Sequence, residues 1–251
     1  RLCDPNLTRY GCFLSDLTGL ASGASAADLP RPISAFHRPS ASREAAGAAR
    51  VVAVDVDDQS LSAARKNLAR LENVRVEKCS VYELDPERLG TFDRVTCIGV
   101  LHHLEDPREA LSRMWDCVAP GGELVLWCYG KEGNRLLLPI IRAFQQLGSR
   151  LPLPVTHTLA KLTTAAIWPA IHAVPWRTDY YRNLRKLSFG NVESIVFDQM
   201  LPKIAHYWSR DDLTRLVAPL GGQLLLEFVQ GNSWHVRVTK PLLSPGRQGA
   251  A

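Results

Sequence analysis

An acidic residue at the end of an apolar run is the first candidate for chemistry in this sequence. Asp55 closes the run "RVVAVD", which is typical of a strand buried on both faces of a parallel sheet. In doubly wound nucleotide-binding folds, a carboxylate at the carboxyl end of a strand accepts hydrogen bonds from ribose hydroxyls. The alternative is a helix cap, but Asp57 and Asp58 are better placed for that role. Asp55 is therefore a candidate ribose ligand.

Two histidines form the second candidate. In "FDRVTCIGVLHHLEDPREAL" an apolar strand runs to Gly99, and His102 and His103 follow it. Ligands bind at the carboxyl edge of such sheets, where Gly99 would allow close backbone approach to a ligand. The histidines would orient or deprotonate a substrate there. The alternative is that both are structural residues with satisfied partners.

A third candidate lies in "SIVFDQMLPKIAHYWSRDDL". Asp198 and His206 would form an acid/base pair if the fold brings them together. The alternative is that His206 and Trp208 pack the preceding segment onto the sheet.

The elements that position these residues alternate between strands and helices. We expect strands at 50–56, 73–79, 92–101 and 122–130, with helices after the first strand and at 107–118. This order predicts an α/β fold with a doubly wound, mostly parallel sheet. A capped helix and the run "QLLLEFVQGNSWHVRVTK" predict a closing antiparallel hairpin.

Three segments do not follow this alternation of strands and helices. Residues 1–46 are rich in Ala, Ser, Pro and Arg and predict irregular chain. Residues 131–190 are apolar and punctuated by proline, which predicts a helical insert that acts as a lid, a lipid-facing surface or plain core. Residues 241–251 read as a loose tail.

Composition sets limits on partners and location. The formal net charge is +5, and the basic group Arg177, Arg182, Arg185 and Lys186 is interpreted as a solvated face, so nucleic acid is not an expected partner. Six cysteines without a CxxC pair favour a reducing, cytoplasmic setting and predict no metal site. We expect no transmembrane segment and no signal peptide, and a start at Arg1 suggests a fragment or a processed chain.

The segments "VVAVDVDDQSLSAARKNL", "FDRVTCIGVLHHLEDPREAL" and "VAPGGELVLWCYG" together resemble the class I S-adenosylmethionine-dependent methyltransferase family, of the type 11/25 kind. The resemblance covers residues 47–130 closely and implies a methyltransferase domain over 47–240. It implies S-adenosylmethionine as cofactor. The residues it assigns to the cofactor site are Asp55 with Val56 at the ribose, Ser80 and Val81 at the adenine, and Gly99 and Val100 along the methionine part.

The sequence departs from the family pattern in two places. Many members carry an Asp where Ser80 stands. A GxGxG loop is also expected about twenty residues before Asp55, because glycines let the following helix N-terminus approach the cofactor. The sequence has "RPISAFHRPS" there, so the loop is missing or scrambled, and residues 1–46 have the composition of a segment read out of frame.

The expected reaction is methyl transfer to an O, N or C nucleophile of a small or lipid-linked metabolite, impaired in the chain as written. The apolar insert and the absence of a concentrated basic stripe favour that substrate class. One alternative is a non-catalytic relative that only binds a partner. A second is an NAD-dependent oxidoreductase, which is disfavoured because it too requires a glycine fingerprint.

Overall fold

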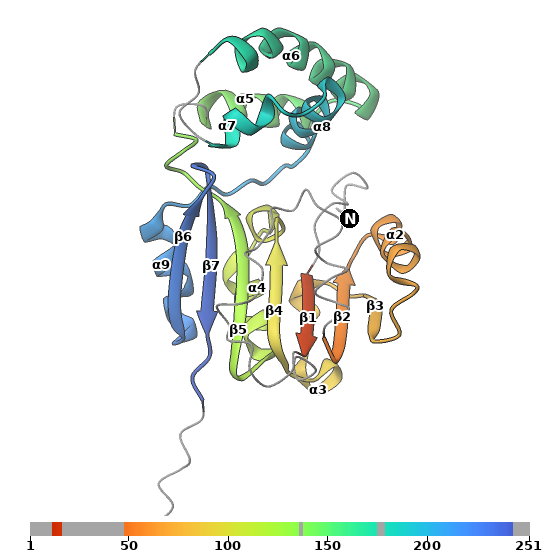
Figure 1. The fold of residues 1–251 in the computed structure, drawn as a ribbon, viewed down its shortest axis with the longest axis vertical. Helices are drawn as coiled ribbons and strands as arrows, with labels where there is room; N and C mark the ends of the chain where they lie inside the picture. Colours follow the sequence, from red (N-terminus) through yellow and green to blue (C-terminus); the bar gives the residue numbers. More distant parts are fainter. Residues whose placement is uncertain (1–11, 17–47, 136–137, 175–178, 243–251) are drawn as a thin grey trace, which may run out of the picture.

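A mixed seven-stranded sheet forms the body of the molecule (Figure 1). The computed structural model describes residues 12–16, 48–135, 138–174 and 179–242, and for 12–16 only the backbone is considered. The strands are β1 (Cys12–Asp16), β2 (Arg50–Asp55), β3 (Val74–Lys78), β4 (Phe92–Ile98), β5 (Val118–Tyr129), β6 (Gln223–Val229) and β7 (Ser233–Thr239). Their spatial order is β3-β2-β1-β4-β5-β7-β6. The α/β class and the closing hairpin predicted from the sequence are confirmed.

Five of these seven described strands run in one direction. β2 pairs with β3 and β4 pairs with β5 in parallel, whereas β7 runs antiparallel to both β5 and β6. The carboxyl ends of β2, β3, β4 and β5 therefore meet at one edge of the sheet, here called the carboxyl edge. Asp55 and Gly99 lie at this edge, as the sequence predicts.

Strand β1 runs against both of its neighbours. Cys12 lies opposite Val54 and Cys97, and Asp16 lies opposite Arg50. The expectation of irregular chain over 1–46 is therefore wrong at 12–16. Pairing on both sides closes the edges of β2 and β4, which would otherwise be unpaired in the middle of the sheet. The proposed boundaries at 46 and 240 remain a prediction.

Short polar signals fix where the helices begin. Asp57 caps α2 (Asp58–Leu68) by accepting the Ser60 N–H at 2.7 Å, as expected once Asp55 is excluded from that role. Asp106 caps α4 (Pro107–Asp116), which starts with proline at its first position. Ser209 and Asp212 form a capping box at α9 (Arg210–Val217). The remaining short helix of this region is α3 (Pro86–Leu89).

The helical insert lies beyond the carboxyl edge (Figure 1). It consists of α5 (Leu138–Gly148), α6 (Leu153–Ala173), α7 (Asp179–Leu184) and α8 (Phe189–Met200). Its last helix extends ten residues past the boundary predicted at 190, so Asp198 belongs to α8. The Tyr180 N–H donates to the Gln230 oxygen at 3.0 Å, which ties the insert to the β6–β7 turn.

One hydrophobic core joins the sheet to α4 and α9. It includes Leu111 and Met114 of α4, Leu213 of α9, and Leu124 and Val236 of the sheet. Each of these side chains is at most 1% exposed, so burial of the apolar faces of both helices stabilises the body. Within the described ranges, no helix combines the length and apolar character needed to cross a bilayer.

Candidate functional site

Asp55 lies at the carboxyl end of β2 with a partly buried, oriented carboxylate. Its Oδ1 accepts the Asp57 N–H at 2.9 Å. Burial raises the pKa of this carboxyl, while the main-chain N–H groups of Asp57 and Val56 oppose the rise. A carboxylate held in one orientation at this edge is suited to accept hydrogen bonds from a diol.

The neighbouring strand ends supply the other residues expected around a nucleoside. The Cys79 N–H donates to the main-chain oxygen of Asp55 at 3.0 Å, which places the turn after β3 directly beside Asp55. Ser80 caps the short 3-10 turn that follows, and its Oγ accepts the Tyr82 N–H at 3.3 Å. Val81 is buried in the core, whereas Val56 is exposed. The Ser80 hydroxyl therefore already has a structural role.

Gly99 ends β4 with a φ of +77°, a conformation in which a side chain would be strained. Its N–H donates to the Trp127 oxygen at 3.3 Å. Val100 follows and packs against the core. The backbone at Gly99 thus turns sharply at the carboxyl edge and carries His102 and His103 into the next turn.

The ring of His103 is half-buried and oriented by the chain segment that follows the insert. Its Nδ1 lies 2.9 Å from the Ile204 main-chain oxygen. Since a carbonyl only accepts, Nδ1 carries the proton in the neutral ring and Nε2 keeps its lone pair. Burial lowers the pKa of His103, and the nearby His206 acts in the same direction. His103 is therefore a neutral imidazole with one basic nitrogen available.

His102 differs from its neighbour because it is completely buried. Neither of its ring nitrogens has a hydrogen-bond partner among the described residues. Its ring centroid lies 3.9 Å from that of Tyr129 and 4.2 Å from that of His103. Burial lowers its pKa well below the ordinary value. The structure thus separates two histidines that the sequence treats alike, and His102 is placed to position His103.

A glutamine from the insert bridges two tyrosines next to these rings. Gln199 of α8 donates to the Tyr129 hydroxyl at 2.7 Å and accepts from the Tyr207 hydroxyl at 3.2 Å. The tyrosine rings stack with centroids 5.3 Å apart. Burial raises the pKa of Tyr207 to about 12, so its hydroxyl remains a donor. Tyr129 and Gln199 were missed by the sequence analysis, although Tyr129 ends a strand at the carboxyl edge.

His206 joins the same cluster. Its main-chain N–H donates to the His102 oxygen at 2.8 Å, and its Nε2 lies 3.1 Å from the Leu104 oxygen. Its ring stacks on that of Trp208, with the ring centroids 5.5 Å apart. Asp198 is not among the hydrogen-bond or ring partners of His206 in the described part of the chain. The anticipated Asp198–His206 pair is therefore not formed, and His206 takes its orientation from the backbone of the turn Leu101–His103, here called the histidine turn, and of Leu104.

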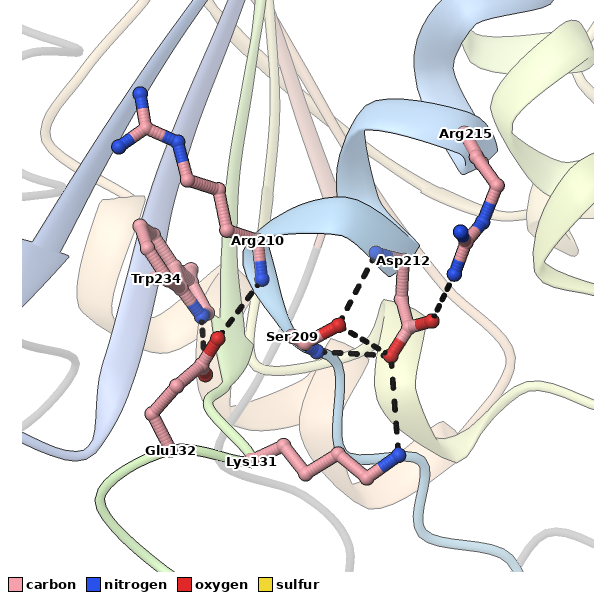
Figure 2. Close-up of polar contacts among 7 residues, drawn as sticks. All are labelled: Lys131, Glu132, Ser209, Arg210, Asp212, Arg215 and Trp234. Carbon is pink, nitrogen blue, oxygen red and sulfur yellow. Dashed lines mark hydrogen bonds and ion pairs between the residues drawn. The ribbon is translucent and has the colours of Figure 1, made fainter.

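A polar network fixes the two chain connections of the insert (Figure 2). Glu132, after β5, accepts the Arg210 N–H at 2.9 Å and the Trp234 indole N–H at 3.1 Å. Asp212 accepts the Ser209 hydroxyl at 2.7 Å. The Ser209 main-chain N–H and hydroxyl lower the pKa of Asp212 to about 2.

Main-chain hydrogen bonds join the same two chain segments. The Lys131 N–H donates to the Trp208 oxygen at 2.9 Å, and the Trp208 N–H donates to the Tyr129 oxygen at 3.1 Å. The segment carrying His206 is thus bound along the end of β5.

A family model described as "Methyltransferase domain" matches residues 38–124. These residues include β2 to β4, the histidine turn and most of the candidate cofactor side. Over this segment the chain matches a methyltransferase domain, and this match supports its resemblance to the class I S-adenosylmethionine-dependent methyltransferase family. The resemblance stated from the sequence is thereby confirmed.

Curated relatives of this methyltransferase domain carry one recurring name. A "Ubiquinone biosynthesis O-methyltransferase" of Dechloromonas aromatica is 30% identical over 96 residues, which are 38% of this chain and 41% of that protein. One of Psychrobacter cryohalolentis is 32% identical over 47% of this chain and 46% of its own length. One of Albidiferax ferrireducens is 29% identical over 65% and 60%. The chain spans less than half the length of the first curated relatives it matches.

Solved structures confirm the fold class. The structure of PKMT2 from Rickettsia typhi has a TM-score of 0.54 at 15% identity, covering 78% of this chain and 45% of that one. The shared feature is the Rossmann-like α/β architecture.

The described residues fit the nucleoside part of S-adenosylmethionine, the cofactor of this family. Asp55 would hold the ribose, and the turn at Ser80 would border the adenine. Strand β1 runs opposite to the first strand of a doubly wound fold, and this direction affects the part of the site that would hold the methionine end of the cofactor. In doubly wound folds the glycine loop leaves the first strand at the carboxyl edge, whereas here the chain leaves β1 after Asp16, opposite Arg50 at the other edge.

Two side chains of the basic group Arg177, Arg182, Arg185 and Lys186 bind to other residues of the insert. Arg182 forms an ion pair with Asp179, and the Arg185 Nε donates to the Ile171 oxygen at 2.8 Å. Arg177 lies outside the described residues. No group of three His, Cys, Asp or Glu side chains in the described ranges is placed to hold a metal ion.

Proposed function

We propose that the protein transfers a methyl group from S-adenosylmethionine to a hydroxyl of a small or lipid-linked metabolite. One observation carries the choice of a protonated nucleophile. His103 is held as a neutral imidazole whose Nε2 has no hydrogen-bond partner among the described residues, at the edge that also carries Asp55. The same kind of methyl transfer also applies to an N or C nucleophile. The names of the curated relatives support the hydroxyl.

The proposed mechanism divides the site into two halves. Asp55 would accept hydrogen bonds from the ribose hydroxyls of the cofactor. Bound S-adenosylmethionine would supply an electrophilic methyl group on a sulfonium ion and would leave as the neutral thioether S-adenosylhomocysteine. His103 Nε2 accepts the proton of the acceptor hydroxyl as the oxygen becomes nucleophilic, and such general-base help contributes about 10²- to 10⁴-fold.

The aromatic residues around the histidines exclude water and orient the ring of His103. His102 packs between His103 and Tyr129, and Gln199 holds Tyr129 and Tyr207 together. Because Gln199 belongs to the insert, the insert covers the part of the site where the methyl acceptor would bind, here called the acceptor side. Holding two reactants in this way lowers the activation free energy by several kcal/mol, and by about 7–11 kcal/mol for ideal alignment.

The direct test is incubation of a native lysate with the purified protein and methyl-labelled cofactor, followed by separation into small molecules, lipids, proteins and nucleic acids. Label in the small-molecule or lipid fraction supports the proposal. Label in protein or nucleic acid contradicts the substrate class. The His103→Gln variant is the matched control, because it retains the cofactor side and should leave the label unincorporated.

One observation favours a second candidate, a methyltransferase-like protein that binds without catalysis. The reversed β1 puts no glycine loop at the carboxyl edge within the described residues. This candidate predicts no binding of S-adenosylhomocysteine at millimolar concentration, measured by calorimetry. Binding that depends on Asp55 would exclude it. A cytoplasmic location remains part of either proposal.

A further inference from the structure

The longest helix of the insert exposes an apolar stripe to solvent. In α6, Val155, Leu162, Ala166, Pro169 and Ala173 follow each other at spacings of seven, four, three and four residues, so they share one face. All five are exposed, with Leu162 63% and Val155 48% accessible. This helix lies at the side of the insert farthest from the sheet (Figure 1).

The packed face of the same helix buries two threonines beside the apolar Ile171 and Trp168. Thr156, Ala160, Thr164 and Ile171 are buried against the rest of the insert. The Thr156 and Thr164 hydroxyls are satisfied by main-chain oxygens of Gly148 and Ala160, at 3.1 and 2.8 Å. A surface helix of a globular protein normally directs its apolar residues to the core and its polar residues to solvent. The outward stripe is therefore an apolar surface without a covering layer in the described chain.

The charge of the insert is mainly positive. Residues 138–200 contain seven Lys or Arg against three Asp or Glu, and none of these acids precedes Asp179. Lys161 and His172 flank the stripe on α6 and are exposed. The nearest acid on the packed side, Glu193 of α8, lies 3.4 Å from His157 and is mostly covered. An exposed apolar stripe on a predominantly basic insert matches the chemistry of an anionic lipid surface.

We propose that α6 docks on anionic phospholipid membranes, with the apolar stripe of Val155, Leu162, Ala166, Pro169 and Ala173 lying in the interface and the basic side chains meeting the headgroups. The charge argues against a second copy of the chain as the occupant, because two basic inserts would then face each other. Docking is independent of methyl transfer. If methyl transfer also holds, docking brings the insert that covers the acceptor side to the membrane surface.

The experiment is flotation of the full chain with vesicles, without cofactor or substrate. One set of vesicles contains equal molar amounts of phosphatidylglycerol and phosphatidylcholine, and the other contains phosphatidylcholine alone. We expect binding to the anionic vesicles that weakens with added salt, and at least about tenfold weaker binding to the neutral ones, since each basic group near the surface contributes about 1 kcal/mol.

The test variant is Leu162→Glu, which should reduce binding to anionic vesicles about tenfold or more, because it removes an aliphatic side chain that docking would bury in the interface and adds a charge that anionic headgroups repel. The matched control is Leu225→Glu on the edge strand β6, where the leucine is 48% exposed and far from the insert. It should bind as the parent does.

Three outcomes would overturn the proposal. They are equal binding of the parent to both vesicle types or to neither, equal loss in both variants, and a concentration-dependent dimer that Leu162→Glu disperses while vesicles are not bound. The last outcome would assign the stripe to a second copy. Circular dichroism of both variants checks that the helices are retained.

Discussion

The Nδ1 atom of His103 lies 2.9 Å from the main-chain oxygen of Ile204, a residue 101 positions later in the chain. This contact joins the turn after β4 to the segment that returns from the insert. It determines the tautomer of His103 and directs the basic Nε2 away from the contact. The chemistry of the acceptor side therefore depends on how the returning segment is held.

Replacing His103 by glutamine should lower kcat about 100-fold, the scale of general-base catalysis, and leave cofactor affinity unchanged. Because burial lowers the pKa of His103, the parent should keep its kcat/KM as the pH falls through the ordinary histidine range and lose it only at lower pH. This acidic limb should be missing in the variant. His172→Gln, on the exposed side of α6, is the control. Full turnover in His103→Gln would remove the assigned role.

His102 should make the protein sensitive to acid. Its pKa is lowered in the folded state, so the unfolded chain binds the proton first as the pH falls below 6.5, and stability is lost in that range. In His102→Phe, the slope of unfolding free energy against pH between 6.5 and 5 should fall by up to about 1.4 kcal/mol per pH unit.

Urea unfolding at several pH values measures this slope. At pH 8 both proteins carry a neutral ring, so the difference there reports packing alone. An unchanged slope would mean that His102 is accessible to protons in the folded state.

Much of the framework was predictable because it depends on local signals. Asp57 as a cap and the apolar runs that form β2 and β4 are visible in the sequence, as is the placement of Asp55 and Gly99 at strand ends. The direction of β1 was not predictable, because strand polarity is set by long-range pairing. The Gln199 bridge was also invisible, since it joins α8 to β5 over 70 residues.

The capping box of α9 gives a prediction about acid stability. Asp212→Asn should lower the unfolding free energy at pH 7 by about 1 kcal/mol, the usual value of such a cap. The pKa of Asp212 is lowered from 3.8 to about 2, so its contribution is present above 3.8 and is lost as the pH falls towards about 2. The difference between parent and variant should shrink over that range. Asp211→Asn, in the same helical turn, is the control: it removes a charge near the helix N-terminus but no capping contact, and should lower the unfolding free energy by only about 0.3 kcal/mol.

Asp55→Ala should weaken binding of S-adenosylhomocysteine by roughly 1.5–3 kcal/mol, the scale of hydrogen bonds to a charged group. The reason is its oriented carboxylate at the end of β2. Calorimetry at protein concentrations suited to weak binding measures the change. Asp58→Ala is the control, since Asp58 is exposed and pairs with Lys78 at 2.7 Å. Equal affinities of all three proteins would place the ribose elsewhere.

The final prediction concerns the reversed β1. The chain as written should bind S-adenosylmethionine weakly, because β1 meets the carboxyl edge with its first residue, Cys12, and residues 1–50 contain no GxGxG pattern. Several main-chain N–H donors to the methionine part are then lost, at about 1 kcal/mol each. A version in which residues 1–49 are replaced by a designed parallel strand followed by a GxGxG loop should bind at least about tenfold more tightly, since β2 and β4 would accept a parallel strand in the same position.

Calorimetry on both versions measures the effect, and urea unfolding shows whether the exchanged strand is accommodated. Resequencing the codons for residues 1–50 separates a frameshift from a genuine N-terminal sequence. Low-micromolar binding by the unmodified chain, with its sequence confirmed, would show that another segment contacts the methionine part and that the reversed strand is compatible with the cofactor.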